Sequence, residues 1–553
     1  MKKPAIIIPS AKLVPGELQK IGKLPGIIYP VNQHIVFDFL YQQYAEISSE
    51  MNVICCESAE LVRKRLSSYK EKKIRVSDLD RLGDLGDTVY KGLENITSPV
   101  IIHFGDTIVF DNIYEEAGDA FFYTEDYISK SWTYFEIEEG VIVRVYDKVE
   151  AGFQGKKKLF VGVFQITDCI CFRKCLEEAF SEAQRDMNSF YYALCLYSRR
   201  HPLKDVAADN WFDVGHAGTY YDTKLEVKAR EFNHIIIDRN RGVLTKTSDD
   251  KEKLIGEILW YLKLPADIEY VHPRIFSYSI EYANPSVSME YYAYHTLHEL
   301  FLYGDLEKRR WADIFSRIKF VCDDLKRYRV KDDHLKESLE DIYLKKTLER
   351  LRNLERDERF SAFFENRIIV NNHQYRSLNE IAGILKMVIP DMLYQVDHFS
   401  IIHGDLCFSN IMVDETCSFI KVIDPRGKFG KYDIYGDFRY ELAKLLHSID
   451  GKYDFIIKDL FTAEYDLSSA RITYQIFDRY IEFDVYGLFT EIFSKEIGGK
   501  KKEIELIEAL LFLSMVPLHG ESLDHQVVML ATGLDILSRV VDIRAEGGDE
   551  TYV

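Results

Sequence analysis

The segment with the clearest chemical pattern is IIHGDLCFSNIMVDETCSFIKVIDPRG, residues 401–427. An apolar pair leads into His403-Gly404-Asp405, Asn410 follows Asp405 five positions later, and Asp424 ends a second apolar run. Phosphoryl transfer needs a carboxylate beside the attacking hydroxyl, and oxygen ligands for the Mg²⁺ that offsets the charge of the polyphosphate. An Asp-x-x-x-x-Asn spacing followed by an Asp at a strand end supplies both, so the segment predicts phosphoryl transfer.

This segment resembles the HGDxxxxN signature of the aminoglycoside phosphotransferase/choline kinase superfamily. The resemblance implies that Asp405 is the catalytic base, that Asn410 and Asp424 bind Mg²⁺, and that His403 braces the loop. It also implies a protein-kinase-like α+β domain with a mostly helical C-lobe.

The next segment, YGDFRYELAKLL at residues 435–446, is similar to the Gly-Asp-x-x-x-Asp-Leu-Ala segment of that superfamily. Glu441 stands in place of the usual Asp. By the same resemblance, Asp437 anchors the catalytic loop and takes no part in the chemistry.

Such a kinase also needs a lysine on the ATP phosphates, held by a glutamate of the following helix. Lys246 lies in the strand-like VLTKTS, and Glu257 lies in the helix-like segment after it. Glu252, in the same segment, is a competing partner for Lys246.

Two further ATP-binding features are expected near these residues. SMEYYAYHTLHELF, residues 288–301, resembles the hinge that receives adenine through backbone groups, at Glu290 and Tyr291. A Gly-rich phosphate loop is not evident in the sequence, and Arg241-Gly242 is the best substitute.

The first half contains a second set of charged residues at strand ends. Asp106 ends an apolar run in FGDTIV, Asp213 lies in WFDVGHAGTYYDTK, and Lys148 follows GVIVRVYD. Two carboxylates can hold one Mg²⁺ over a nucleoside triphosphate, and a lysine can bind the phosphate of a second substrate. In this order the segments resemble the sugar-phosphate nucleotidyltransferase family over roughly residues 4–224.

That resemblance implies that Asp106 and Asp213 bind Mg²⁺ and that Lys148 binds the acceptor phosphate. It also implies that Gly86 approaches the nucleotide base, where a side chain would block it. The family's Gly-rich loop with an Arg is replaced by PSAKLVPGELQKIGKLPGIIYPV. Lys12, Lys20 or Lys23 is expected to supply the missing charge, and the sequence does not decide among them.

The pattern of apolar runs predicts the elements that position these residues. Short runs at 5–9, 52–56 and 100–106 alternate with helix-like stretches, which indicates βαβ units and a mainly parallel, Rossmann-like sheet. The pattern changes near residue 228, and beyond residue 300 it becomes mostly helical. We therefore expect a nucleotidyltransferase-like domain at 1–228 and a kinase-like domain at 229–553, with the charged run 332–360 forming a solvated helix face.

Composition narrows the classes of partner. The 553 residues carry a net charge of −19, which disfavours non-specific binding to nucleic acid or to anionic membranes. No apolar stretch approaches a membrane span, and the N-terminus is too short in apolar residues for a signal peptide. The nine Cys are expected to be reduced thiols in a cytoplasmic protein, and Cys171 and Cys175 lack a matching His/Cys pair nearby in the sequence.

The two halves together predict a bifunctional enzyme. The kinase would phosphorylate a sugar, polyol or choline-like molecule with ATP, and the nucleotidyltransferase would join that phosphate to CTP or UTP, releasing pyrophosphate. The product would be an activated precursor for surface polysaccharide. Arg426 and Lys428 favour an anionic or polyhydroxyl acceptor. The alternatives are a kinase with a degenerate, nucleotide-binding regulatory N-terminal domain, and a glycosyltransferase, which would ordinarily show a D-x-D.

Overall fold

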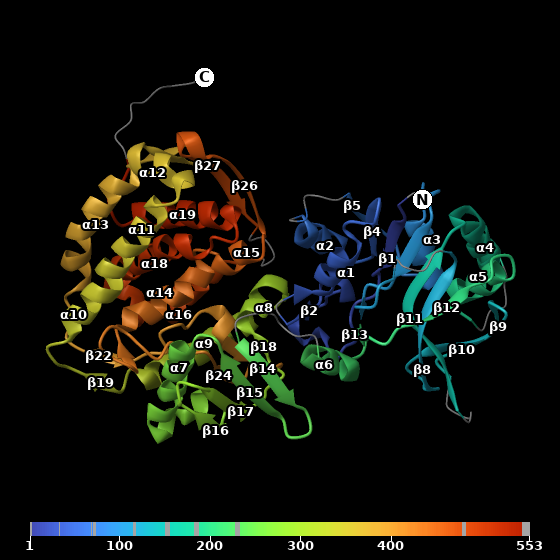
Figure 1. Cartoon of the computed structure of the whole chain (residues 1–553), viewed down its shortest axis with the longest axis horizontal. Coiled ribbons are helices and arrows are strands. Elements are labelled where there is room, and N and C mark those ends of the chain that lie inside the picture. The colour runs from blue at the N-terminus through green and yellow to red at the C-terminus, as the bar shows by residue number, and fades with distance from the viewer. Residues whose placement is uncertain are drawn as a thin grey trace. The chain divides into compact units, whose positions relative to one another are not determined.

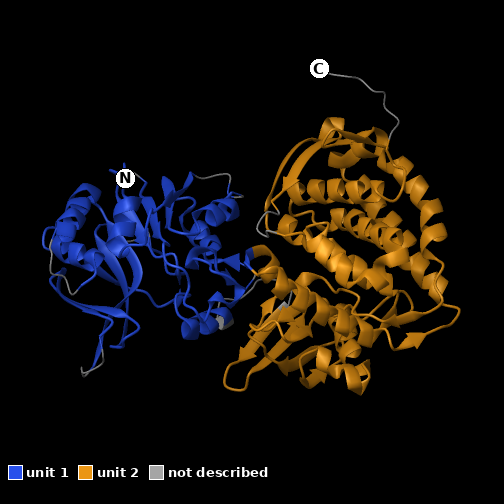
Figure 2. Ribbon diagram, turned by 180° about the vertical axis from the view of Figure 1, so that it is seen from behind, with its two compact units in different colours: residues 1–229, 303–305 blue, residues 230–302, 306–553 orange. Residues whose placement is uncertain are grey.

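The computed structural model describes residues 3–32, 34–67, 69, 73–113, 118–149, 155–181, 187–226, 233–477 and 483–544 (Figure 1). The chain divides into two compact units, which Figure 2 shows in different colours. Residues 1–229 and 303–305 form the N-terminal unit, and residues 230–302 and 306–553 form the C-terminal unit.

A nine-stranded sheet forms the centre of the N-terminal unit. Its main path runs β10-β9-β11-β6-β1-β4-β5, and β8 pairs with both β11 and β12. Within it, β5, β4, β1 and β6 run parallel to one another. The strands are β1 Ala5–Pro9, β4 Glu50–Cys55, β5 Ile74–Asp78, β6 Val100–His103, β8 Ala120–Tyr127, β9 Thr133–Glu138, β10 Val141–Asp147, β11 Lys156–Ile166 and β12 Lys204–Ala207.

Both faces of the parallel strands are covered, and β1 is buried at every position. On one face, Ile7 and Ile54 share a core with Val89, Phe172 and Phe190 of three helices. On the other face, the hydroxyl of Tyr44 lies 2.7 Å from His103 Nδ1. The helices are α1 Val36–Tyr44, α2 Ala59–Leu66, α3 Leu85–Gly92, α4 Cys169–Ser181, α5 Ser189–Ser198 and α6 Ala217–Glu226.

The expectation of a mainly parallel sheet holds for only one part of it. β11 runs antiparallel to β6, β8 and β9, and β9 pairs antiparallel with β10, so the sheet is mixed. For β9 and β10 the reason is their connection, which is a tight turn at Glu139 and Gly140, both with positive φ. A turn of this length reverses the chain, whereas parallel neighbours need a longer crossover.

Two small antiparallel pairs complete the N-terminal unit. β7 Thr107–Val109 pairs with β13 Trp211–Asp213 in a register that sets Asp213 opposite Thr107. β2 Pro30–Val31 pairs with β3 His34–Ile35. The pairing of β7 with β13 therefore brings Asp213, which lies late in the sequence of this unit, beside the turn that follows β6.

The C-terminal unit begins with an antiparallel sheet in the order β14-β15-β17-β16. A turn with Gly242 at φ +62° joins β14 to β15, and helix α7 Lys251–Lys263 follows β15. Asp250 caps α7 through Lys253 N, and Pro265 lies just past its end. The strands are β14 Asn233–Asp238, β15 Val243–Ser248, β16 Ile275–Ser279 and β17 Ser286–Glu290.

Helices make up most of the rest of this unit. They are α8 Leu297–Tyr303, α9 Lys308–Leu325, α10 Leu335–Leu339, α11 Lys346–Glu355, α12 Ser361–Glu365, α13 Leu378–Leu393, α14 Phe438–Ile449, α15 Tyr453–Ile457, α16 Val485–Ile492, α17 Ser494–Ile497, α18 Lys501–Met515 and α19 Leu523–Ser538. A π-helical stretch, Glu340–Lys345, joins α10 to α11. The charged run 332–360 is therefore helical through 335–355, but it buries an apolar stripe and is not simply a solvated face.

Short strands lie between these helices. β18 His295–Thr296, β23 Ile411–Val413 and β24 Ile420–Val422 form one small sheet, and β19 Arg329–Val330, β22 Phe399–Ile401 and β25 Tyr435–Gly436 form another. A four-stranded sheet contains β20 Ile368–Val370, β21 His373–Tyr375, β26 Phe461–Asp466 and β27 Arg471–Ile476. The segment between β22 and β23, and the end of β24, carry the residues predicted to act in phosphoryl transfer.

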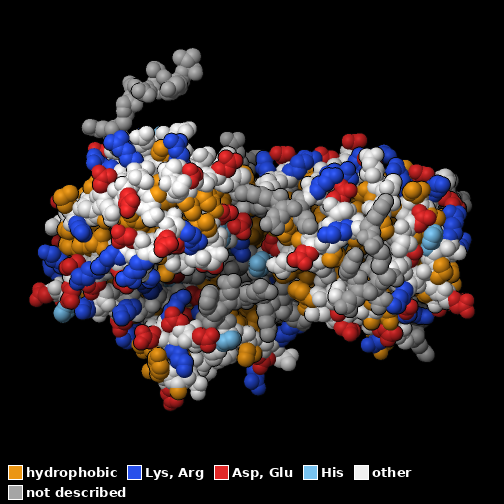
Figure 3. Space-filling view, turned by 45° about the horizontal axis from the view of Figure 1, so that its top comes forward, with side chains coloured by type: hydrophobic (Ala, Val, Ile, Leu, Met, Phe, Trp, Pro, Cys, Tyr) orange, Lys and Arg blue, Asp and Glu red, His pale blue; other side chains and the backbone are white. Residues whose placement is uncertain are grey.

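The surface shows no segregation of basic side chains on the face drawn in Figure 3, where the described Lys and Arg residues are interspersed with Asp and Glu. None of the helices in the described part of the chain is both long enough and apolar enough to span a membrane.

Candidate functional site

A cavity of about 560 Å³ lies in the N-terminal unit where β1 and β6 end. The carboxyl ends of parallel strands are where such sheets ordinarily bind ligands. Three residues predicted from the sequence line this cavity, namely Lys12, Asp106 and Lys148. The other lining residues are Pro9, Ser10, Ala11, Leu13, Val14, Pro15, Gly26, Leu82, Gly83, Asp84, Leu85, Thr88, Phe104, Asp147, Asn188, Tyr191, Gly215 and His216.

Asp106 lies in the turn between β6 and β7, which His103 holds in place. His103 Nε2 is 3.1 Å from the carbonyl oxygen of Thr107, and burial lowers the pKa of His103 to about 4, so the ring is neutral at pH 7. A Cβ at Gly26 would lie 2.8 Å from Asp106 Cβ, so the chain at residue 26 passes too close for any side chain. Burial, and next the charge of Asp213, raise the pKa of Asp106 to about 6.

Asp213 faces the same point from the end of β13. A Cβ at Gly215 would lie 2.7 Å from Asp106 Oδ2 and 3.2 Å from Asp213 Oδ1, so the two carboxylates converge there. The other oxygen, Asp213 Oδ2, accepts hydrogen bonds from the backbone N–H of His216 (3.1 Å) and from the hydroxyl of Thr219. A divalent cation bound between Asp106 and Asp213 would offset the repulsion that raises the pKa of Asp106. Carboxylate oxygens are ligands that Mg²⁺ prefers, so these residues fit Mg²⁺.

His216 was not identified from the sequence. Its Nδ1 lies 2.9 Å from Asp213 Oδ2, and this hydrogen bond raises its pKa. Its ring also packs on Trp132, with ring centroids 4.5 Å apart. The signal available in the sequence was its place three residues after Asp213, but only the fold shows that it lines the cavity.

Lys148 and Lys12 are the two lysines at the cavity. Lys148 adopts a left-handed conformation at φ +53°, and its N–H donates to the carbonyl of Trp132 at 3.1 Å. Lys12 lies close enough for its charge to lower the pKa of Asp106, against the larger effects of burial and Asp213. Lys20 and Lys23 are exposed and do not line the cavity, so among the three candidates the structure favours Lys12.

Gly86 packs against α5 in the structure, and its expected approach to the nucleotide base stays a prediction. A Cβ there would lie 2.0 Å from Ser189 Oγ, so Gly86 allows α3 to pack closely on α5, and it does not line the cavity. Asp84, at the start of α3, does line the cavity. Its carboxylate accepts hydrogen bonds from Ser189 N (2.8 Å) and Ser189 Oγ (2.6 Å), which fixes this wall.

In the C-terminal unit, Lys246 of β15 joins two of the predicted residues. Its Nζ lies 2.7 Å from Glu257 Oε2 and 2.7 Å from Asp424 Oδ1. Burial opposes its charge, but Asp424 and Glu257 outweigh that effect and raise its pKa. Glu252, the competing partner, is exposed on the first turn of α7.

Burial, followed by the charge of Asp424, raises the pKa of Glu257 to about 7. Asp424 adopts a left-handed conformation at φ +58°, and its N–H donates to the hydroxyl of Tyr261 at 3.2 Å. The Asp424 carboxylate is thereby directed at Lys246. A buried carboxylate, Glu257, and a partly exposed one, Asp424, on one ammonium leave excess negative charge, which Mg²⁺ bound to Asp424 would offset.

The loop carrying Asp405 is held from several sides. Glu441 of α14 accepts hydrogen bonds from His403 N (2.9 Å) and Gly404 N (2.7 Å), so the residue that departs from the usual Asp still anchors the loop. His403 Nε2 lies 2.9 Å from the carbonyl of Ile423, and burial lowers the pKa of His403 to about 4. A neutral ring therefore links the Asp405 loop to the strand that ends at Asp424.

Asn410 lies beside Asp405. Its Nδ2 donates to the Asp405 carbonyl (2.8 Å) and carboxylate (3.2 Å), which orients the Asn410 side-chain oxygen away from Asp405. The backbone carbonyl of Asn410 accepts a hydrogen bond from Ile423 N at 3.0 Å. Asn410 and Asp424 therefore lie at neighbouring ends of paired strands. An amide oxygen and a carboxylate are both suitable Mg²⁺ ligands.

Lys444 is a residue that sequence reasoning missed. From α14, its Nζ lies 2.8 Å from Asp405 Oδ1. Burial of Asp405 opposes its ionisation, but Lys444, and then His403 and Arg426, lower its pKa to about 2. Asp405 is therefore a carboxylate across the physiological range, suited to orienting a hydroxyl and accepting its proton late in the reaction.

Asp437 makes structural contacts, but none of its hydrogen bonds among the described residues is to the Asp405 loop that it was expected to anchor; Glu441 makes those. Asp437 accepts hydrogen bonds from Arg439 Nη2 (2.7 Å) and from the hydroxyl of Tyr343 (2.9 Å), and it caps α14. At the expected adenine hinge, the backbone N–H groups of Glu290 and Tyr291 are already bonded within the protein, and the hinge stays a prediction. The N–H of Glu290 donates to Arg274 and the N–H of Tyr291 to Gly242, because the chain continues to pair with its neighbours there, so neither N–H is available to a base.

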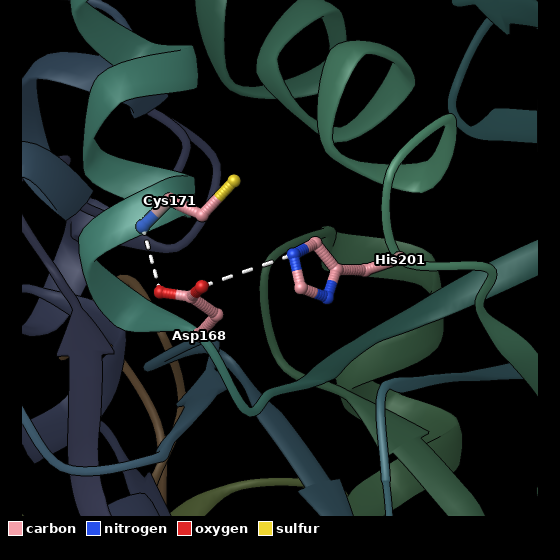
Figure 4. Close-up of side chains that lie close together, drawn as sticks. All are labelled: Asp168, Cys171 and His201. Carbon is pink, nitrogen blue, oxygen red and sulfur yellow. Dashed lines mark hydrogen bonds and ion pairs between the residues drawn. The ribbon is translucent and has the colours of Figure 1, made fainter.

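The fold also brings together residues near Cys171 that are distant in the sequence. Asp168 accepts a hydrogen bond from Cys171 N at 2.9 Å, and His201 Nε2 lies 3.8 Å from Asp168 Oδ2 (Figure 4). The cluster has a structural explanation, since Asp168 lies at the start of α4 and the His201 ring stacks on Tyr197 with centroids 4.6 Å apart.

Searches of protein-family models and of curated proteins find no match to the sequence. Among solved structures, nucleotidyltransferases match the N-terminal part of the chain. CTP:phosphocholine cytidylyltransferase from Streptococcus pneumoniae is 13% identical with a TM-score of 0.34, and the match covers 41% of this chain and 99% of that one. Inositol-1-phosphate CTP transferase from T. maritima is 13% identical with a TM-score of 0.32, and the match covers 41% of this chain and 98% of that one.

HddC from Yersinia pseudotuberculosis is 14% identical with a TM-score of 0.32, covering 41% of this chain and all of that one. At these identities and scores, a match carries no inference about what the chain binds or transforms. The resemblance of the C-terminal half to small-molecule kinases remains a prediction from its sequence.

Proposed function

We propose that the protein is a bifunctional cytoplasmic enzyme that phosphorylates a small alcohol and then activates the product with a nucleotide. In the first step, the acceptor oxygen attacks the γ-phosphorus of ATP, the bond to the bridging oxygen breaks, and ADP leaves. In the second step, a phosphate oxygen of that product attacks the α-phosphorus of CTP or UTP, and pyrophosphate leaves. The nucleoside diphosphate product would serve surface polysaccharide synthesis.

The observation that carries the kinase assignment is the position of Lys246. It joins Glu257 of the following helix to Asp424, 178 residues further along the chain, with both distances at 2.7 Å. A lysine placed in this way can hold the ATP phosphates once Asp424 binds Mg²⁺. The antiparallel sheet with one helix, followed by a mostly helical region, supports the same assignment.

The chemistry assigned to each side chain follows from its surroundings. Mg²⁺ on Asn410 and Asp424 would offset the charge that develops on the transferred phosphoryl group. Asp405 orients the acceptor hydroxyl and takes its proton. His403 stays neutral and holds the loop, since burial lowers its pKa to about 4.

The nucleotidyltransferase assignment rests on the convergence of Asp106 and Asp213 at a cavity edged by Lys12 and Lys148. Mg²⁺ on the two carboxylates would bind the triphosphate of the nucleotide. Lys148 would bind the phosphate of the acceptor, and Lys12 would offset charge on the departing pyrophosphate.

A second candidate function is a kinase whose N-terminal unit binds a nucleotide without transferring it. The observation in its favour is that residues 10–15, which form one wall of the cavity, contain no glycine, whereas close approach of a backbone to phosphates ordinarily uses glycine. The side chains of Asp106, Asp213 and Lys148 favour the first function.

The experiment that separates the two uses the intact chain with ATP and a panel of alcohols, followed by CTP or UTP. ADP and pyrophosphate release are measured separately. Under the bifunctional proposal, Asp106→Ala abolishes pyrophosphate release and leaves ADP release unchanged. If no nucleotide gives pyrophosphate with the enzyme's own phosphorylated product, the N-terminal unit is a binding domain.

A further inference from the structure

Basic side chains gather around Asp405 beyond what the proposed reaction uses. Lys444 and Arg426 both lower the pKa of Asp405 through their charge, against the effect of burial. Lys346 of α11 lies close enough to this group for the charges of Arg426, Lys444 and Arg350 to add to burial in lowering its pKa. Lys444, Arg426 and Lys346 therefore lie near one catalytic carboxylate, and Arg350 lies near Lys346.

Arg426 is held in a fixed position in this cluster. Its N–H donates to the carbonyl of His403 at 2.9 Å, and its Nη1 donates to the hydroxyl of Tyr440 at 2.9 Å. A Cβ at Gly404, which has φ +78°, would lie 2.9 Å from Arg426 Cβ, so the glycine is what allows the arginine so close to the catalytic loop. No hydrogen bond among the described residues uses the other guanidinium donors of Arg426, so they can serve a ligand.

Lys346 is the unexpected member of the cluster. It is the first residue of α11, directly after the π-helical stretch, and it forms no ion pair among the described residues. Burial, followed by the charges of Arg426, Lys444 and Arg350, lowers its pKa to about 7, and only Asp405 opposes this. A half-buried lysine that faces three cations is unfavourable unless an anion joins them.

A cavity of about 560 Å³ borders the cluster at Arg426. Its other lining residues are Asp341, Ile342, Lys428, Gly430 and Lys431. Lys346 lies four residues after Ile342 on the same continuous helical run. The cavity thus offers room for a small molecule beside the cations, in the same unit as Asp405.

We propose that the acceptor of the kinase reaction is a small alcohol that also bears a carboxylate or phosphate group. In this arrangement, Arg426 and Lys346 bind the anionic group while Asp405 receives the hydroxyl. A cationic acceptor of the choline type would meet like charge at the same position. This proposal rests on the kinase function proposed above and specifies its substrate class.

The test compares acceptors that share a carbon skeleton. ADP release is measured with glycerol, glycerate and glycerol 3-phosphate, and with choline as the cationic arm. We expect kcat/KM for the better anionic acceptor to exceed that for glycerol by about 10-fold or more. A preference for glycerol or choline overturns the proposal while leaving the kinase function in place.

Variants test whether Lys346 binds the anionic group of the acceptor. Lys346→Met should raise KM for the anionic acceptor about 10-fold and leave KM for ATP unchanged. Lys336→Met, at an exposed lysine of α10, is the matched control and should change neither value. If Lys346→Met instead raises KM for ATP alone, the cluster serves ATP and the proposal is wrong.

A binding measurement keeps the test independent of turnover. Acylation of Lys346 in the intact protein is followed by mass spectrometry with inorganic phosphate, glycerate or choline present, at constant ionic strength. We expect phosphate or glycerate to slow acylation of Lys346 about 10-fold relative to choline, with Lys336 unaffected. If Lys346 is acylated at the same rate with phosphate, glycerate and choline, the anion site is refuted. If phosphate or glycerate slows the acylation but no acceptor gives ADP release, the kinase function is refuted instead.

Discussion

Replacing Asp106 by Asn should stabilise the N-terminal unit while removing its nucleotidyltransferase activity. Burial and the charge of Asp213 raise the pKa of Asp106 from 3.8 to about 6. A change of this size corresponds to about 3 kcal/mol of unfavourable interaction for the ionised form. Because Asp106 is only partly buried, water screens some of this, and we expect a gain of about 1–3 kcal/mol in the free energy of unfolding at pH 7.

The sign of the pH dependence follows from the raised pKa. Between pH 3.8 and about 6 the folded state binds more protons at Asp106 than the unfolded state does, so the natural protein loses stability as pH rises through this range. Asn cannot ionise. The gain in the free energy of unfolding from Asp106→Asn should therefore be absent below pH 3.8, grow between pH 3.8 and about 6, and be complete above pH 6.

Hydrogen exchange of β1 and β6 in the intact protein measures the free energy of opening of this unit alone. Mg²⁺ should stabilise the natural protein and not Asp106→Asn, since the cation offsets the repulsion that Asn removes. Asp80→Asn, at an exposed carboxylate, is the control and should leave exchange unchanged. A variant no more stable than the natural protein at pH 7 would refute the reasoning that Asp106 and Asp213 repel each other.

Further predictions concern single substitutions in the C-terminal unit and this unit expressed alone. Asp405→Asn should lower kcat for ADP release about 10³-fold with the circular dichroism spectrum unchanged, and substantial turnover by the folded variant would remove its catalytic role. Lys246→Met should weaken ATP binding, measured by calorimetry with Mg²⁺ present, because Glu257 and Asp424 then lack their shared cation. Glu441→Ala should destabilise the protein to urea by about 2–5 kcal/mol, since two buried N–H groups lose their acceptor; an unchanged midpoint would contradict this. Residues 229–553 expressed alone should retain ADP release, and inactivity across several nearby boundaries would argue against separable units.

Local patterns in the sequence predicted much of the fold. The buried strand 5–9 and the strand expected at 100–106, which ends at His103 in the structure, were found as β-branched runs, and the turn at Arg241–Gly242 joins two strands as expected. The mixed order of the first sheet was not predicted, because hydrophobic alternation does not say which way a neighbouring strand runs. The use of the Glu290 and Tyr291 N–H groups in strand pairing was not predicted for a related reason, since only the fold shows which N–H groups are already bonded; the hinge itself stays a prediction.

The sequence by itself determined the types of chemical group at the candidate sites. Asp405, Asn410 and Asp424 are identified by their spacing, because a short segment of chain fixes how three nearby side chains can converge. Only the tertiary structure decided which distant groups surround them. Lys444 at Asp405, His216 at Asp213, and the choice of Lys12 over Lys23 depend on packing between elements far apart in the chain. Lys346 shows the reason most clearly: in the sequence it is one charge in a charged helix, and its pKa falls only because the fold buries it among three other cations.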